Sequence, residues 1–68
     1  MIHKTLGDRL RWSLKLRHFS QHEFAEMLEI SESAMSKIIN DKQQPNARMI
    51  VTICRKLGIS SDWLLGLM

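Results

Sequence analysis

A chain of 68 residues predicts a single domain over 1–68, whose thin core buries only about 60% of the surface that the unfolded chain exposes. Its one cysteine excludes an internal disulfide, and no apolar run approaches the roughly 20 residues that cross a bilayer. The net charge of +3 is weak evidence for nucleic acid by itself, because many soluble domains match it. Packing between helices must therefore hold the fold, with or without help from a partner chain.

The charges are grouped along the chain. Residues 1–18 hold five lysines and arginines against one aspartate, residues 20–32 hold four glutamates and no lysine or arginine, and basic residues return from position 37. Two basic blocks thus flank an acidic one and can meet in space, although an ordinary solvated surface explains the same pattern. Lys4 and Asp8 stand where a signal peptide would be apolar, which predicts a cytoplasmic setting away from the membrane.

The apolar residues recur at helical spacing almost throughout, which predicts an all-α fold of five helices. The first helix is expected from about Thr5 to Arg17, with Leu6, Leu10 and Leu14 on its inward stripe and a basic opposite face. Trp12 falls outside this stripe. It can cover the basic side chains, pack under the carboxyl-terminal tail or join a partner chain.

Two short helices follow, each preceded by a serine that can cap it. Ser20 precedes the second helix, where Glu23 can complete a capping box, and this helix is expected to end near residue 28. Ser31 precedes the third helix, which is expected over residues 32–40. The residues of the pair that are expected to point inward are Phe24, Ala25, Leu28, Met35 and Ile38.

The remaining helices begin after a polar loop that ends in Pro45. Asn46 is the expected cap of the fourth helix, Gly58 supplies its left-handed stop, and Ser60 caps a last turn over 61–65. A core thiol is expected at Cys54 rather than a nucleophile, and neither a metal nor a cofactor is predicted. The expected buried stripe of the fourth helix consists of Ala47, Ile50, Val51, Cys54 and Leu57.

The segment from Gln21 to Asn40 carries the main functional signal. Each of its helices is shorter than the roughly 12 residues at which an isolated helix becomes marginal in water, and only Glu29, Ile30 and Ser31 separate them. A helix-turn-helix arrangement fixes such a pair by crossing the helices closely, and Ala25 supplies the small residue that this approach needs. The third helix can then stand clear of the body and enter the ~12 Å major groove of DNA.

These residues resemble the Cro and phage-repressor type of helix-turn-helix protein, also called Xre-like, over nearly the whole chain. The resemblance implies a compact five-helix, lambda-repressor-like DNA-binding domain of phage or prophage type, acting as a transcriptional regulator and most often as a repressor. The matching residues are Leu6–Arg11, Ser20–Gln21, Ala25–Glu26, Leu28, Ile30–Ser31, Ser33, Ser36, Ile38, Pro45, Leu57–Ser60 and Asp62–Leu65.

The resemblance also implies contacts to DNA. Gln21 at the start of the second helix would anchor a phosphate, helped by helix amides, or it is a simple capping-turn glutamine. Asn40 and Lys42 match positions that hold the DNA backbone, although Asn40 can also be a mere helix stop. The residues that match the positions facing the major groove are Glu32, Ser33, Ala34 and Lys37.

Each of these base-facing residues has its own chemistry. Lys37 can donate to guanine O6 and N7, Ser33 can pair with several bases, and the Ala34 methyl can rest against a thymine methyl. Glu32 is repelled by phosphates, so it must accept a hydrogen bond from cytosine N4 or hold a neighbouring basic side chain. Alternatively, Glu32 only adds a favourable charge to the first turn of a helix, worth ~0.3–1 kcal/mol.

Several positions depart from the family pattern. His18, Glu29 and Asp41 stand where glycine is common, and each of them can strain the backbone. His3, His18 and His22 lack metal-ligand spacing and are expected on the surface or in loops, with a minor phosphate contact open for His22.

A double departure concerns Leu14 and Ile39, because many members of the family have a buried arginine and a glutamate at these two places. Replacing a buried ion pair by matched apolar groups is often neutral or stabilising by ~1–4 kcal/mol. We therefore predict that Leu14 and Ile39 touch in the core. The alternative, an exposed Ile39, would leave a sticky residue on the surface.

The partners follow from the same resemblance. Two-fold operators with half-sites about 34–36 Å apart imply a homodimer on double-stranded DNA. The expected dimer contact is Trp63, Leu64, Leu67 and Met68, although Trp63 can equally cap its own core. An antitoxin or adaptor-type protein-interaction module is the alternative function, and exposed Ile39, Leu67 or Met68 would favour it. An enzyme is not expected, because the sequence lacks a nucleophile–base pair and a phosphate loop.

Overall fold

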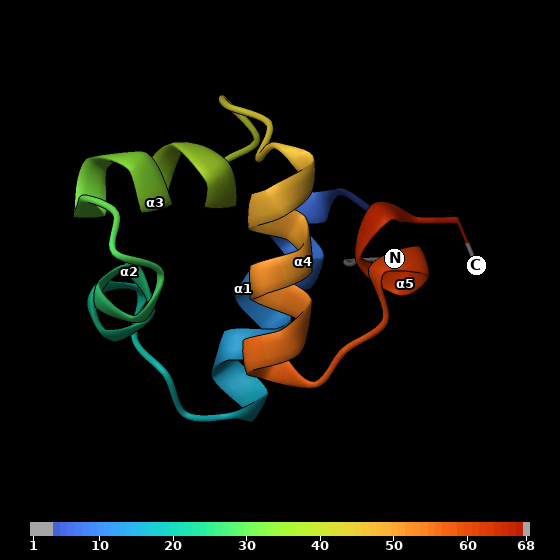
Figure 1. The fold of residues 1–68 in the computed structure, drawn as a ribbon, viewed down its shortest axis with the longest axis horizontal. Coiled ribbons are helices and arrows are strands. Elements are labelled where there is room, and N and C mark those ends of the chain that lie inside the picture. The colour runs from blue at the N-terminus through green and yellow to red at the C-terminus, as the bar shows by residue number, and fades with distance from the viewer. Residues whose placement is uncertain (1–3, 68) are drawn as a thin grey trace.

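The computed structural model describes residues 4–67, and these fold into helices without strands (Figure 1). No helix in this part of the chain is long and apolar enough to cross a bilayer. The all-α class is confirmed, and the helix ends shift only by single residues: Thr5, Arg17 and Asn40 cap helices instead of belonging to them. The helices are α1 (Leu6–Leu16), α2 (Gln21–Leu28), α3 (Glu32–Ile39), α4 (Ala47–Leu57) and α5 (Ser61–Leu65).

The helices enclose one core. α1 and α4 lie at the centre, with α2 and α3 on one side of them and α5 on the other (Figure 1). Each leucine- or phenylalanine-sized side chain that becomes fully buried contributes ~1.5–3 kcal/mol, so this cluster is what holds so small a fold together. The buried residues of the cluster are Leu10, Leu14, Phe24, Ala25, Leu28, Met35, Ile38, Ile39, Ile53, Cys54, Leu57 and Leu64.

A polar side chain caps the amino end of every helix in residues 4–67. At α1, the Thr5 hydroxyl accepts a hydrogen bond from the Asp8 amide at 3.0 Å. At α4, the Asn46 side-chain oxygen accepts one from the Met49 amide at 2.8 Å. Such caps contribute ~1 kcal/mol each, which matters most for helices of only two turns. The four caps predicted from the sequence, namely Ser20, Ser31, Asn46 and Ser60, are confirmed.

The predicted inward stripe of α4 is wrong at two positions. Val51 is 47% exposed and Ala47 is exposed too, whereas Ile53, which the prediction left out, is fully buried. The buried face follows the helical spacing of residues 50, 53, 54 and 57 and is therefore rotated away from Val51. Both faces carry apolar residues, so only the packing against α1 and α5 decides which one turns inward.

The departures from the family pattern are accommodated in the backbone. His18, Glu29 and Asp41 all adopt a left-handed conformation with φ of 59°, which is the conformation that favours glycine. Leu14 and Ile39 are both buried, with 3% and 1% of their surface exposed, and they belong to the same core cluster. The alternative of an exposed Ile39 is therefore wrong, while a direct contact between the two side chains remains a prediction.

Candidate nucleic-acid interface

A reciprocal capping box fixes the amino end of α2. The Ser20 hydroxyl accepts a hydrogen bond from the Glu23 amide at 3.0 Å, and the Glu23 carboxylate accepts one from the Ser20 amide at 2.8 Å. The hydrogen bond from the Ser20 amide is the main reason that the pKa of Glu23 is lowered. The box leaves Gln21 and His22 exposed at the end of α2 where the backbone amides carry a partial positive charge.

A tight turn then brings α3 across α2. Glu29 adopts the left-handed conformation that ends α2, and the Ile30 amide donates to the carbonyl of Ala25 at 3.0 Å. The Ser31 hydroxyl accepts from the Ala34 amide at 3.0 Å, so that α3 begins at Glu32. Glu29 thus caps the end of α2 and Ser31 caps the start of α3. These two caps set the angle between two helices that are too short to be stable in isolation.

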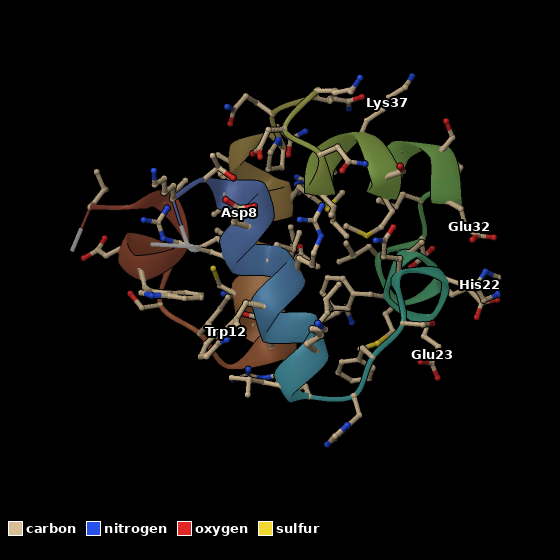
Figure 2. All side chains as sticks on the ribbon, turned by 180° about the vertical axis from the view of Figure 1, so that it is seen from behind. Asp8, Trp12, His22, Glu23, Glu32 and Lys37 are labelled. Atoms are coloured by element: carbon tan, nitrogen blue, oxygen red, sulfur yellow. The ribbon has the colours of Figure 1, made fainter. Side chains whose placement is uncertain are left out.

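The two faces of α3 have opposite character. Met35, Ile38 and Ile39 are buried and anchor the helix to the body of the protein. On the other face, Glu32, Ser33 and Lys37 are exposed, and the Lys37 side chain extends away from the molecule (Figure 2). Ala34 is half-buried beside Ile30 and Pro45 and offers only part of its methyl group. Three of the four residues expected to face bases therefore lie on the outward side of α3, and Ala34 lies at its border.

The residues expected to contact phosphates differ in how far they are engaged within the chain. Gln21 and Lys42 are exposed. The side-chain nitrogen of Asn40, Nδ2, donates to the carbonyl of Ser36 at 2.9 Å, and the side-chain oxygen of Asn40 accepts from the Arg11 guanidinium at 3.1 Å. Asn40 is the carboxyl-terminal cap of α3, and its side chain links that end of the helix to α1.

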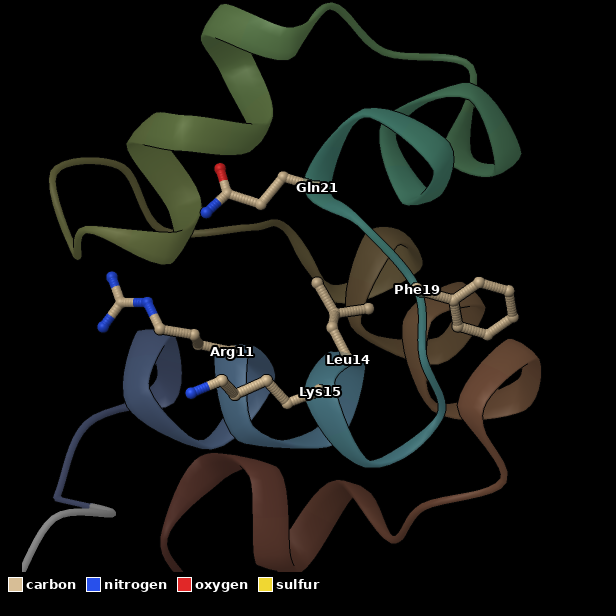
Figure 3. A pocket seen from close by; sticks show the side chains of 5 residues that line it. All are labelled: Arg11, Leu14, Lys15, Phe19 and Gln21. Atoms are coloured by element: carbon tan, nitrogen blue, oxygen red, sulfur yellow. The ribbon is translucent and has the colours of Figure 1, made fainter.

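Arg11 and Lys15 were absent from the contacts expected from the sequence, yet both reach the same surface. They extend from α1 toward the side on which Gln21 extends from α2 (Figure 3). These three side chains, with Leu14 and Phe19, line a hollow of about 260 Å³. Arg11 also donates to the carbonyl of Ile39 at 3.4 Å. The grouping of basic residues on the outer face of the first helix was the signal that could have identified them.

Glu32 does not stand alone at the start of α3. Its carboxylate lies 2.9 Å from Nδ1 of His22, which comes from the amino end of α2. This contact fits the role in which Glu32 holds a neighbouring basic side chain, and the place of Glu32 in the first turn of α3 fits the role of a favourable helix-end charge as well. Asp8 plays a similar part for Arg11, whose guanidinium lies 3.6 Å from the Asp8 carboxylate.

Comparison with known proteins identifies the family. A helix-turn-helix family model matches residues 10–64, which is most of the chain. The chain belongs to this helix-turn-helix family.

Two relatives show how the family resemblance extends. The chain is 29% identical over 62 residues to the HTH-type transcriptional regulator ImmR of Bacillus subtilis (strain 168), a match that covers 91% of this chain and 49% of ImmR. It therefore spans about half the length of this curated relative. The P22 c2 repressor, solved in complex with a synthetic operator, is 26% identical with a TM-score of 0.84 over 91% of this chain and 94% of that one. The expected Cro and repressor type of fold is thus confirmed.

On the far side of the molecule from the helix-turn-helix, α5 carries Trp63 and Leu64, two of the residues expected to form a dimer contact (Figure 1). Leu64 is fully buried in the chain's own core, so it has no surface to offer to a second chain and the expectation for it is wrong. Trp63 is half-buried and lies with its ring centroid 5.8 Å from that of Trp12, which fits the intramolecular alternative. Leu67 is 73% exposed, and Met68 lies outside the described residues.

The cysteine and two of the three histidines show the burial that was expected from the sequence. Cys54 is buried in the core of the helix-turn-helix domain, and this burial raises the pKa of its thiol. His18 and His22 are exposed as expected, and His3 lies outside the described residues. Within residues 4–67, no three histidine, cysteine or acidic side chains come together as ligands of a metal ion would.

Proposed function

We propose that this chain binds specific sequences of double-stranded DNA as a transcriptional regulator, with α3 in the major groove. The observation that carries this proposal is the division of α3 into a buried face and an outward face that presents Ser33 and Lys37. A rigidly anchored helix with free polar side chains on one face is what direct reading of base edges requires. The similarity to a repressor solved with its operator supports the same reading.

The contacts to bases follow from the chemistry of the outward face. Lys37 donates to guanine O6 and N7, Ser33 pairs with a base edge, and the half-exposed methyl of Ala34 packs against a thymine methyl. Glu32 accepts from the amino group of cytosine. Each well-formed base contact contributes ~1–3 kcal/mol of discrimination against a wrong base, so these residues set the sequence preference.

The contacts to phosphates use the basic surface around this helix. Gln21 and the amides at the start of α2 hold one phosphate, and Lys42 beyond α3 holds another. Arg11 and Lys15 extend the same surface on α1, and Asn40 contributes by orienting Arg11 and by its own contact to the backbone. These contacts position α3 without reading sequence.

A homodimer on a two-fold operator is part of the proposal, and so is action as a cytoplasmic repressor. The apolar residues that remain exposed near α5 offer a contact for a second copy. Trp63, which is half-buried, and Leu67, which is 73% exposed, would contribute to this contact, and Met68, the last residue expected in it, lies outside the described residues. Sedimentation of the DNA complex tests the proposal: two chains per site are expected, and one chain per site would refute the dimer.

The alternative function, an antitoxin or adaptor-type module, loses one of its supports. An exposed Ile39 would have favoured a protein partner, but Ile39 is buried under α1. Leu67 is exposed, but the proposed contact with a second copy of the chain also explains an exposed apolar residue at this position. We therefore keep DNA binding, without catalysis, as the function of the domain.

Selection of bound duplexes from a random-sequence pool tests this function. Recovery of a common, two-fold symmetric sequence is expected. The selected duplex is then titrated with salt in a gel shift, where the logarithm of the affinity should fall by roughly 0.9 per phosphate neutralised for each tenfold rise in salt. A pool that yields no common sequence, or a binding that salt does not weaken, would contradict the proposal.

A further inference from the structure

His22 lies between two carboxylates at the edge where α2 and α3 meet. Its Nδ1 is 2.9 Å from a Glu32 carboxylate oxygen, Oε2, and its Nε2 is 3.7 Å from Glu26 Oε2. Figure 2 shows His22, Glu23 and Glu32 gathered at this edge, away from the body of the protein. The contact with Glu32 joins the first turn of α2 to the first residue of α3.

The position of Glu32 makes this contact consequential. Glu32 is the first residue of α3 and precedes Ser33, so its side chain belongs to the outward face of that helix. A free carboxylate there would be repelled by DNA phosphates, and its flexible side chain would lose rotamer freedom on meeting a base. A charged His22 removes much of the repulsion and restrains Glu32. Because His22 engages Oε2, the other oxygen of the carboxylate can accept a hydrogen bond from a base.

We propose that His22 in its charged form is a positioning residue for Glu32, and that it thereby makes base recognition at the start of α3 dependent on pH. The inference rests on the proposed DNA-binding function. It assigns His22 a role in sequence preference, in contrast to the minor phosphate contact considered from the sequence, which would act on all sequences alike.

The charged groups around the imidazole favour its protonation. Glu23 and Glu26 lie on its own helix and Glu32 on α3, and the hydrogen bond to Glu32 is the largest cause that raises the pKa of His22 above its usual value of 6.5. If Glu32 contacts its base well only while His22 is charged, binding of that base in turn favours the charged ring and raises the pKa of His22 further. The complex therefore binds more protons than the free partners, so the affinity for DNA falls as pH rises through the His22 pKa, and it levels off above the pKa of the bound state.

Two measurements test the inference, and the first does not involve DNA. The His22 ring is titrated by NMR in the wild-type chain and in Glu32→Gln. We expect a lower His22 pKa in the variant, because the hydrogen bond from a charged ring to a carboxylate is lost. An unchanged His22 pKa would overturn the proposal, because it would mean that the contact with Glu32 does not exist in solution.

The second measurement is the affinity for the selected duplex between about pH 5.5 and 8, the range in which histidine titrates. We expect the wild-type association constant to fall by up to about tenfold per pH unit within part of this range, as linkage to one proton allows. His22→Gln and Glu32→Gln should both flatten this dependence. His18→Asn is the matched control: this histidine is also exposed, asparagine tolerates its left-handed backbone, and the pH dependence should persist.

Base preference separates positioning from a simple phosphate contact. A second duplex carries a substitution at the base pair whose preference Glu32→Gln relaxes, and the discrimination between the two duplexes should decline as pH rises in the wild type only. If His22 only touched a phosphate, both duplexes would weaken in parallel and Glu32→Gln would keep the pH dependence, which would overturn the inference while DNA binding stands. If the pool yields no duplex at all, the proposed function fails and the inference fails with it.

Discussion

The Asp41 carboxylate accepts a hydrogen bond from the Gly7 amide at 2.9 Å, so the residue after the carboxyl-terminal cap of α3 binds the first turn of α1. Its other oxygen accepts from the Thr5 hydroxyl at 2.6 Å. Asp41 replaces a residue that is commonly glycine in the family, and its left-handed backbone keeps the glycine conformation while its side chain gains this second task. The amino end of α1 and the carboxyl end of α3 are thereby locked together.

Gly7→Ala is expected to destabilise the fold, because the new Cβ would collide with the carbonyl oxygen of Ile39 and lie 2.7 Å from an Asp41 carboxylate oxygen. Overpacking of this kind typically costs ~1–3 kcal/mol, and here backbone must move to relieve it. Urea unfolding measures the loss. Lys56→Ala, an exposed change on α4, serves as the control and should stay within about 0.5 kcal/mol of the wild type. A Gly7→Ala chain as stable as the control would disprove the close approach.

Asp41→Ala and Asp41→Gly separate the two properties of this residue. Both variants lose the acceptor for Gly7 and Thr5, which costs ~1 kcal/mol as for other helix caps. Only glycine also relieves the left-handed backbone, by roughly 1–2 kcal/mol. We therefore expect the alanine variant to be clearly less stable than the wild type and the glycine variant to be close to it in free energy of unfolding. Equal stabilities of the two variants would show that the backbone at residue 41 is not strained.

Glu29→Gly is expected to stabilise the protein by about 1 kcal/mol. Glu29 ends α2 with a φ of 59°, a conformation that glycine adopts without the steric penalty of a side chain. Thermal unfolding followed by circular dichroism is the measurement. Glu26→Gly provides the contrast, because Glu26 lies within α2 and glycine there should cost about 1 kcal/mol. A loss of stability in Glu29→Gly would mean that its side chain makes a contribution that exceeds the strain.

The predicted contact between Leu14 and Ile39 can be tested by restoring the ion pair that the family often has there. Leu14→Arg and Ile39→Glu should each cost ~3–5 kcal/mol, because each leaves an unpaired charge in the core. The double variant should be more stable than either single one, as the two charges meet. Circular dichroism reports how much of each chain is folded. Leu14→Arg with Ile38→Glu is the control and should show no such recovery; absence of recovery with Ile39→Glu as well would argue against the contact.

Lys37 and Lys42 should differ in what they do to DNA binding. Lys37→Ala is expected to relax the preference at one base pair, with a loss of ~1–3 kcal/mol for the selected duplex. Lys42→Ala should weaken binding to all duplexes alike. It should also lower the magnitude of the slope of log affinity against log salt by about one, as the loss of one phosphate contact does. Competition binding with singly substituted duplexes distinguishes the two patterns. A uniform loss for Lys37→Ala would place this lysine on the DNA backbone.

The sequence by itself determined where the helices begin and end. Caps such as Ser20 with Glu23, or Asn46, act on amides within three residues, so their effect is local and can be seen without the fold. The positions of Glu29 and Asp41 were marked by the family resemblance, because glycine is common there, and both residues adopt the left-handed conformation. Part of the outward face of α3 also followed from the sequence, because helical spacing places Met35 and Ile38 together on the opposite face, whereas the burial of Ile39 was settled only by the fold.

Only the tertiary structure decided which of two apolar faces turns inward and which distant polar groups meet. Val51 and Ile53 are equally apolar, and their different burial depends on the helices packed against α4. Leu64 is buried because α5 packs on α1 and α4. The expectation that Leu64 contacts a second chain was therefore wrong. The links from Arg11 to Asn40 and from His22 to Glu32 join residues on different helices. Local spacing carries no information about such pairs, because the angle between the helices determines the distance between their side chains.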